Sequence, residues 1–303
     1  MMTAMVTCHA PAKINLGLMI EGRRRDGYHD IATIFLKITL TDTLYVEATS
    51  GDIEIQCTHP AVPCDERNLI YRAIAMLQPL APGRGARVRL EKRIPVAAGV
   101  GGGSSDAAAV LLAVNTLWGL QLSADDLMPY GAQLGADVPF FLYPSPAAYG
   151  RGRGDELSPL TCPNSFFLVL VTPPVAVSTA QVYGQYKIEL TDVAKDTTIV
   201  RQHFESGDLP SLAATCTNDL ETVVIRQFPI VQTVKETLSQ PGTYGVGMSG
   251  SGPTVYAFCP SQDVAERVAA VARSQGWPTW VCRPWSSGIS VLNTAVSVRE
   301  NDR

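Results

Sequence analysis

The chain begins with a region in which every second residue is apolar. This alternation, from position 14 to position 20, predicts a β-strand that buries one face. The opposite face then carries Lys13, Asn15 and Gly17. Short apolar runs bounded by turn residues predict further strands, at 31–36, 43–47 and 53–57.

The next part of the chain combines helical patterns with one more alternating segment. Residues 68–77 are predicted to form a helix, and residues 87–94 alternate as a strand does. A glycine-rich stretch at 99–103 follows. It leads into an alanine- and leucine-rich segment at 105–118, which predicts a helix that Gly119 ends.

A second helix and a possible domain boundary follow. Ser123 is expected to cap a helix that ends near Gly135, with acidic residues in its first turn. The apolar residues after Pro139 are predicted to form a strand. Residues 143–164 are rich in Pro, Gly and Ser, which favours a boundary between two domains in this segment.

The second half of the chain is predicted to mix strands and helices. We expect strands at 166–171, 244–248 and 254–258, and helices at 218–226, 230–238 and 262–274. The sequence therefore predicts two α+β domains, one over residues 1–160 and the other over residues 161–303.

Composition limits the class of protein. Hydrophobic residues make up 46% of the chain and charged residues 17%, which is typical of a globular protein with a sizeable core. The net charge of −4 and the lack of a long basic run argue against nucleic-acid binding. No apolar run is long enough for a membrane span and the N-terminus does not resemble a signal peptide, so we expect a cytoplasmic protein without a membrane partner.

The cysteine pattern favours reduced thiols. The chain has 7 cysteines, an odd number without C-x-x-C pairs. Cys57, His59 and Cys64 lie close together and could form part of a metal site, but three ligands without a second pair favour ordinary core or loop residues. Nothing in the sequence marks a subunit interface, so monomer and homodimer both stay open.

The strongest local motif is the glycine-rich loop between a strand and a helix. Glycines let a ligand approach the backbone, whose N–H groups can bind phosphate together with the start of the next helix. The loop is neither a Walker A motif nor a dinucleotide fingerprint, and a tight turn is the alternative. We expect it to bind phosphate groups through Pro95, Val96, Ala97, Ala98, Gly99, Val100, Gly101, Gly102, Gly103, Ser104 and Ser105. The hydroxyl groups of Ser104 and Ser105 are candidates for binding phosphate or magnesium.

Three further features are candidates for chemistry. Phosphoryl transfer requires a carboxylate near the acceptor hydroxyl group, and a lysine that keeps this carboxylate ionised. Lys13 and Asp137 have the required chemistry, although a surface charge and a helix-end acid are the alternatives. Residues 26–29 form a turn in which Tyr28 could stack on a base and His29 could bind a base edge; a hairpin turn with a packed tyrosine is the alternative.

Three segments, in this order along the chain, resemble the GHMP kinase superfamily. They are residues 11–16, the glycine loop with the start of its helix at 99–106, and the second glycine-rich segment at 247–254. Within the superfamily, the residues at 12–16, 26–29, 68–70 and 135–139 resemble the kinases that act on 4-diphosphocytidyl-2-C-methyl-D-erythritol.

The resemblance implies a fold and a reaction. The expected structure is the two-domain α+β GHMP kinase fold, with an N-terminal ATP-binding α/β domain, a ferredoxin-like C-terminal domain and a cleft between them. The expected activity is ATP- and Mg²⁺-dependent phosphorylation of the 2-hydroxyl group of this CDP-methylerythritol compound, in the non-mevalonate isoprenoid pathway.

The resemblance also implies roles for single residues. Asp137 would be the catalytic base and Lys13 its partner. Residues 95–105 would bind the ATP phosphates, and residues 250–252 would close over them from the second domain. The substrate would be held by Asn15, Tyr28, His29, Thr179 and Tyr183. Among these, Tyr183 would be the second aromatic around the cytosine, in a segment that lacks the more usual Thr-Pro pair.

Other functions share the same loop. Another GHMP kinase, acting on homoserine, mevalonate or a sugar, would need the same phosphate-binding residues, as would a diphosphomevalonate decarboxylase. A non-catalytic nucleotide sensor on this fold would be expected to lack Lys13 or Asp137, and both residues are present.

Overall fold

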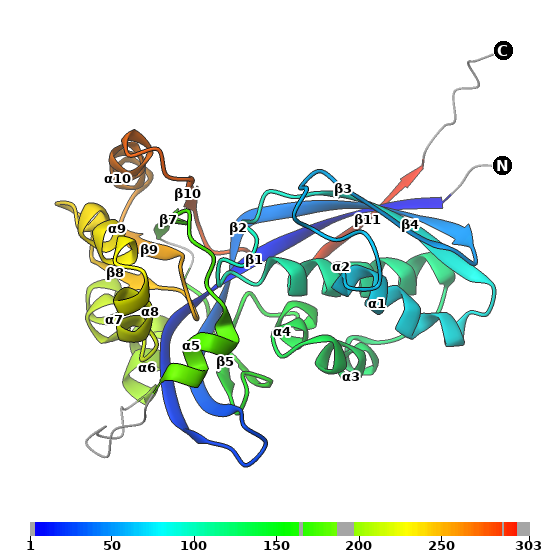
Figure 1. Cartoon of the computed structure of the whole chain (residues 1–303), viewed down its shortest axis with the longest axis horizontal. Helices are drawn as coiled ribbons and strands as arrows, with labels where there is room; N and C mark the ends of the chain where they lie inside the picture. The colour runs from blue at the N-terminus through cyan, green and yellow to red at the C-terminus, as the bar shows by residue number, and fades with distance from the viewer. Residues whose placement is uncertain (1–3, 164–165, 187–196, 287, 296–303) are drawn as a thin grey trace.

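The computed structural model describes residues 4–163, 166–186, 197–286 and 288–295. It contains a seven-stranded and a four-stranded sheet, each with helices packed against it (Figure 1). The seven-stranded sheet with its helices is called the first unit, and the four-stranded sheet with its helices is called the second unit. The elements of the first part are β1 (Ala4–Arg23), β2 (His29–Ser50), β3 (Ile53–Cys57), α1 (Leu69–Leu77), the 3₁₀ turn η1 (Gln78–Leu80), β4 (Arg84–Glu91), α2 (Gly102–Trp118), α3 (Ala124–Leu134), α4 (Val138–Leu142), β5 (Ala147–Arg151) and β6 (Glu156–Pro159).

The first sheet is organised around two long antiparallel strands. β1 and β2 pair along most of their length, and β4 and β5 pair with different parts of β2. β3 pairs with β4 in parallel, and β6 pairs with β5. The last strand of the chain, β11 (Ser290–Ala295), returns to pair with β1. Helix α2 packs against β1 and β2, and α1, α3 and α4 lie on the same side (Figure 1).

The second sheet follows the ferredoxin-like order. Counted within this unit, its strands run 4-1-3-2, and each neighbouring pair is antiparallel. Its elements are β7 (Phe167–Val171), α5 (Thr179–Gln185), α6 (Thr197–Ser206), α7 (Leu209–Thr215), α8 (Glu221–Gln227), α9 (Ile230–Leu238), β8 (Gly245–Met248), β9 (Val255–Cys259), α10 (Gln262–Ser274) and β10 (Thr279–Cys282). Among the described residues, no helix is both long and apolar enough to cross a membrane.

Backbone hydrogen bonds join the second unit to the long strands. The Leu18 N–H donates to the Thr217 carbonyl at 2.8 Å, and the Asp219 N–H donates to the Leu18 carbonyl at 2.9 Å. On β2, the Trp285 N–H donates to the Lys37 carbonyl at 2.9 Å. β1 and β2 therefore contact both units. The boundary at residue 160 stays a prediction; β6 ends at Pro159 and β7 begins at Phe167.

Two local predictions were wrong. The predicted strands at 31–36 and 43–47 are parts of the single strand β2, because β1 pairs with this segment without a turn. The strand predicted after Pro139 is the helix α4, in which all five apolar residues are buried and the proline occupies the first turn, where its missing N–H costs nothing. The segment 143–164, in which the boundary was predicted, contains the β5–β6 hairpin.

A buried group of charges connects β2, the end of β4 and α2. The Lys92 ammonium lies 2.5 Å from the Asp42 carboxylate and 2.7 Å from the Asp106 carboxylate. The other oxygen of Asp42 accepts hydrogen bonds from the backbone N–H groups of Arg93 and Ile94. All three charged side chains are at most 4% exposed. This group fixes the chain directly before the glycine-rich loop.

We expect Lys92→Met to destabilise the protein by about 3–5 kcal/mol, because two buried aspartates would lose their shared counter-charge. Urea unfolding measures the loss. The matched control is Arg273→Met, which removes an exposed ion pair with Glu266 and should cost less than about 1 kcal/mol. Equal stabilities of the two variants would contradict a structural role for the Lys92 group.

Candidate active site

A cavity of about 980 Å³ lies between the two units. β1, the turn before β2, the glycine-rich loop and the start of α4 line it from the first unit, and α5 and the loop at 250–251 line it from the second. Most of the predicted site residues border this one cavity: Lys13, Asn15, Tyr28, His29, Pro95, Val96, Ala97, Ala98, Gly99, Gly101, Gly102, Gly103, Ser104, Asp137, Thr179 and Tyr183.

The glycine-rich loop forms one wall of the cavity. It ends at Gly101, which has a φ of 71° and precedes the first turn of α2. A Cβ atom on Gly101 would lie 3.0 Å from the Lys13 side chain, so glycine serves both the backbone conformation and the close packing. The N–H groups of the first turn of α2 have no partner within the helix, because no turn precedes them. They are available to an anion in the cavity.

The loop also contacts the second unit. Gly99 has a φ of 75°, and a Cβ atom there would lie 2.6 Å from the Ser249 carbonyl oxygen. The Ser249 hydroxyl donates to the Gly99 carbonyl at 3.1 Å and accepts from the Asn15 N–H at 3.2 Å. The loop at 249–252 is therefore fixed against the glycine-rich loop.

Lys13 and Asp137 meet in the cavity. The Lys13 ammonium lies 3.2 Å from the Asp137 carboxylate and donates to the Asn15 side-chain oxygen at 2.8 Å. The Asn15 amide in turn donates to the Thr33 hydroxyl at 3.1 Å. Lys13 is buried, whereas the Asp137 side chain is 34% exposed to the cavity side. The lysine is thus fixed by several bonds, and the carboxylate keeps room for a second contact.

The position of Asp137 follows from the short helix that comes after it. Asp137 has helical backbone angles immediately before α4, and its side chain forms no capping bond to that helix. The side chain therefore bonds across the cavity to Lys13 instead. The five residues of α4 that follow are all buried, so the helix next to the Asp137 carboxylate is packed in the core.

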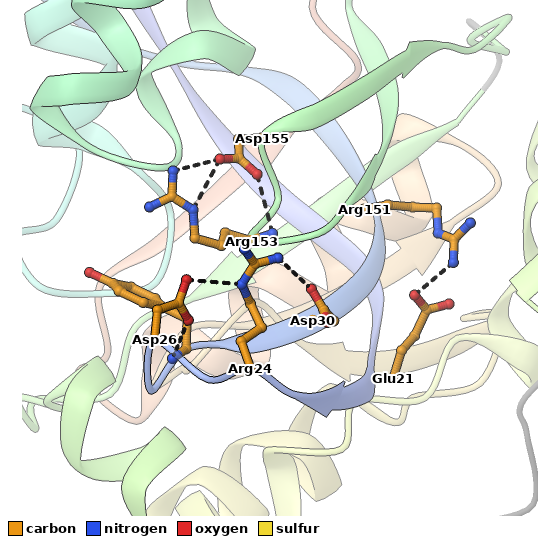
Figure 2. Close-up of polar contacts among 8 residues, drawn as sticks. Glu21, Arg24, Asp26, Asp30, Arg151, Arg153 and Asp155 are labelled. Carbon is orange, nitrogen blue, oxygen red and sulfur yellow. Dashed lines mark hydrogen bonds and ion pairs between the residues drawn. The ribbon is translucent and has the colours of Figure 1, made fainter.

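Charged residues brace the turn at one end of the cavity. Arg24 bonds to Asp26 at 3.1 Å and to Asp30 at 2.9 Å, so it spans the turn that carries Tyr28 (Figure 2). Arg153 is paired with Asp155 at 2.7 Å, and its guanidinium lies 5.5 Å from the centre of the Tyr28 ring. The Tyr28 ring is 57% exposed, although it borders the cavity.

An aromatic pair joins the two units beside this turn. The rings of His29 and Tyr183 lie 5.4 Å apart at 32°, and Tyr186 is 6.4 Å from His29. Burial and the Arg23 charge lower the pKa of His29, which favours the neutral imidazole at pH 7. Burial, with a smaller effect of Asp137, raises the pKa of Tyr183 above its usual range, so its hydroxyl group stays protonated. The predicted sandwich of Tyr183 with Tyr28 stays a prediction.

Two predicted residues do not line the cavity. Val100 is buried in the core, and its carbonyl accepts the Lys13 N–H at 2.9 Å. Ser105 is fully buried in the first turn of α2. Thr179 does line the cavity, and its hydroxyl group lies 2.8 Å from that of Ser251.

Several lining residues were not predicted from the sequence, among them Lys92, Asp106 and Arg153. Burial raises the pKa of Asp106, which Lys92 opposes. Asp106 follows the Gly-Ser loop directly and could have been recognised there, but its pairing with Lys92 depends on the fold. Arg153 lies in the segment 143–164, which was predicted to contain the domain boundary.

The chain matches two family models and several relatives over most of their length. Residues 68–145 match the GHMP kinases N terminal domain, and residues 200–276 match the GHMP kinases C terminal model. A 4-diphosphocytidyl-2-C-methyl-D-erythritol kinase of Thermosynechococcus vestitus is 39% identical, over 93% of this chain and 97% of the relative. The enzyme of the same name from Syntrophotalea carbinolica is 41% identical, over 91% and 97%.

Solved structures agree with this relationship. The crystal structure of a 4-(cytidine 5'-diphospho)-2C-methyl-D-erythritol kinase superimposes with a TM-score of 0.79 and 36% identity, covering 92% of this chain and all of the other. A homoserine kinase from Cytophaga hutchinsonii superimposes with a TM-score of 0.76 at 19% identity, which reflects the shared fold alone. The predicted two-domain α+β fold is therefore confirmed, and the chain belongs to the GHMP kinases and, among them, to the family of 4-diphosphocytidyl-2-C-methyl-D-erythritol kinases.

Proposed function

We propose that this protein transfers the γ-phosphoryl group of ATP to the 2-hydroxyl group of 4-diphosphocytidyl-2-C-methyl-D-erythritol, a step of the non-mevalonate route to isoprenoid precursors. The observation that carries the proposal is the Lys13–Asp137 pair at 3.2 Å, in the same cavity as the glycine-rich loop and the His29–Tyr183 aromatic pair. The relatives named for this reaction support it.

Asp137 is the proposed acceptor of the hydroxyl proton. As the hydroxyl oxygen forms its bond to the γ-phosphorus, the bond between that phosphorus and the bridging oxygen breaks and ADP leaves. The proton moves to the Asp137 carboxylate, which keeps an exposed side toward the cavity. Lys13 favours the ionised carboxylate and offsets negative charge on the transferring group.

The glycine-rich loop and the start of α2 are the proposed site for the ATP phosphates. The free N–H groups at this helix start point toward an anion, and the helix dipole favours negative charge there. Ser104 adds a hydroxyl group on the cavity side. The 250–251 loop faces the same space from the second unit.

The start of α2 also fits a magnesium ion. Ser105 Oγ and Asp106 Oδ1 are buried and have no hydrogen-bond partner among the described residues, and hydroxyl and carboxylate oxygens are typical of magnesium sites. Asp106 borders the cavity, so Ser105 and Asp106 are the proposed residues for holding the ion. When bound, magnesium offsets the charge of the phosphate groups.

The other end of the cavity is the proposed cytidine site. His29, with its neutral imidazole, can both donate to and accept from a base edge. Tyr28 and Tyr183 provide aromatic faces from the two units, and Asn15 and Thr179 provide polar groups nearer to Lys13. Arg153 beside Tyr28 adds positive charge where the diphosphate of the substrate would lie.

The direct test is an acceptor panel. ADP release is measured with ATP and Mg²⁺ and with the cytidine compound, homoserine, mevalonate or galactose as acceptor, and with an EDTA control. We expect turnover with the cytidine compound alone, and none with EDTA. Turnover with another acceptor would keep the phosphate site but contradict the proposed cytidine site. Binding of ATP without turnover would favour a nucleotide sensor.

We expect Asp137→Asn to lower kcat by about 10²–10⁴-fold, because the amide cannot accept the proton. The Kd for ATP should change little, since the glycine-rich loop is intact. Steady-state kinetics and calorimetric ATP titration measure both. The control is Asp125→Asn in the exposed first turn of α3, which should retain kcat. A kcat near the wild-type value for Asp137→Asn would refute the role of the base.

We expect Tyr28→Ala to weaken binding of the cytidine compound by about 1–3 kcal/mol, the scale of stacking a base on an aromatic ring. Affinity for ATP should stay the same. Calorimetric titration of each ligand separates the two effects. Tyr244→Ala is the control, because Tyr244 is 41% exposed but does not line the cavity. A loss of ATP affinity in Tyr28→Ala would assign the turn to the nucleotide side.

A further inference from the structure

Lys37 is a buried lysine that the proposed mechanism does not use. Its side chain is 0% exposed, and within the described part of the chain no ion pair involves it. Burial lowers its pKa to about 7. Burying an ammonium group is costly, so a lysine kept in this position requires bonds that offset the cost.

The bonds of Lys37 go to the end of α4. Its ammonium donates to the Tyr143 carbonyl at 2.5 Å and to the Phe141 carbonyl at 3.4 Å. These carbonyls belong to the last turn of the helix and the residue after it, where no further turn supplies N–H donors. Protonated or neutral, the amine keeps at least two N–H groups, so both bonds survive its titration.

Lys37 and Lys13 are neighbours across the β1–β2 ladder. They are directly paired in its register, so their side chains project from the same face of the sheet. Lys13 contacts Asp137 at the start of α4, and Lys37 contacts its end. The five-residue helix is therefore held at both ends by one cross-strand pair.

Two stacked rings fill the space between the lysines. The Lys13 ammonium lies 5.2 Å from the centre of the Phe35 ring, and Lys37 lies 5.1 Å from that of Phe140. The two rings stack on each other at 5.1 Å. Since Phe140 belongs to α4, a shift of this helix would disturb the stack, the Lys37 bonds and the position of Asp137 together.

We propose that Lys37 is a positioning residue for phosphoryl transfer, which fixes the C-terminal end of α4 so that Asp137 stays against Lys13. The inference rests on the proposed role of Asp137. Lys37 does not line the cavity and touches neither substrate, so its effect on the reaction passes through α4. An isolated helix of five residues is not stable, so α4 depends on its packing in the core and on the contacts at its ends.

The test is a double-mutant cycle with Lys37→Met and Asp137→Asn. Lys37→Met keeps the length of the side chain and removes its donors. We expect kcat to fall by about 10²-fold, the scale of an ångström-sized misplacement, with KM for both substrates and the Kd for ATP nearly unchanged. In the Asp137→Asn background the same change should have little further effect on kcat.

A purely structural role predicts a different outcome. Lys37→Met would then leave kcat per ATP-binding site unchanged, or the two losses would multiply in the double variant; either result would overturn the proposal. The stability control is Val234→Ala in the core of the second unit, which should lower the melting temperature but not kcat. If Lys37→Met does not fold, Lys37→Gln, which retains an amide donor, enters the same cycle.

A readout without substrate keeps this test separate from the proposed function. A crystal structure of the Lys37→Met protein should have the Lys13–Asp137 separation lengthened beyond 4 Å, the usual limit of an ion pair. An unchanged separation would overturn the positioning role, whichever acceptor the enzyme uses. If wild-type protein fails with the cytidine compound but the separation lengthens, the proposed substrate fails and the role of Lys37 stands.

Discussion

The pairing register of β1 and β2 is the constraint on which the site depends. A shift of β1 by one residue against β2 would turn Lys13 and Asn15 to the face opposite that of Lys37. The ladder is long, and it bears hydrogen bonds to both units, so such a shift would also break the contacts of Leu18 and Lys37 with the second unit. The same register therefore places Lys13, the proposed catalytic lysine, as well as the contacts of the long strands with α4 and with the second unit.

Three buried lysines around the cavity illustrate different ways of keeping a charge inside a protein. Lys92 has two carboxylates, Lys13 has one carboxylate and an amide, and Lys37 has only carbonyls and an aromatic ring. The pKa of Lys92 is raised by Asp106 and Asp42 against the effect of burial, whereas that of Lys37 is lowered by burial. A lysine that must stay charged needs carboxylate partners. A lysine that only has to donate hydrogen bonds does not need them.

Sequence reasoning was most successful where a short pattern carries its own physical meaning. The cap at Ser123 and the strand that carries Lys13 depend on neighbouring residues, and both lie where they were expected. The predicted alternation is interrupted, because both faces of β1 are buried around Lys13 and the register shifts between Leu16 and Leu18. The helix after the glycine-rich loop begins at Gly102, three residues before its predicted start. The helix α4 was missed because five consecutive apolar residues have no readable period, and only packing decides between strand and helix. Lys37, Asp106 and Arg153 were missed because their partners are distant in the chain. The roles of the predicted site residues stay predictions.

The fold is shared with kinases of other names, since a homoserine kinase superimposes with a TM-score of 0.76 at 19% identity. The proposed acceptor preference is therefore expected to reside in the side chains that line the cavity. The turn at 26–29 and helix α5 each contribute aromatic side chains to one end of the cavity. Because His29 belongs to the first unit and Tyr183 to the second, the pair forms only when the units are held together. The bonds of Ser249 to Gly99 and Asn15 hold them at the phosphate end. The proposed acceptor site and the proposed phosphate site therefore both depend on contact between the two units.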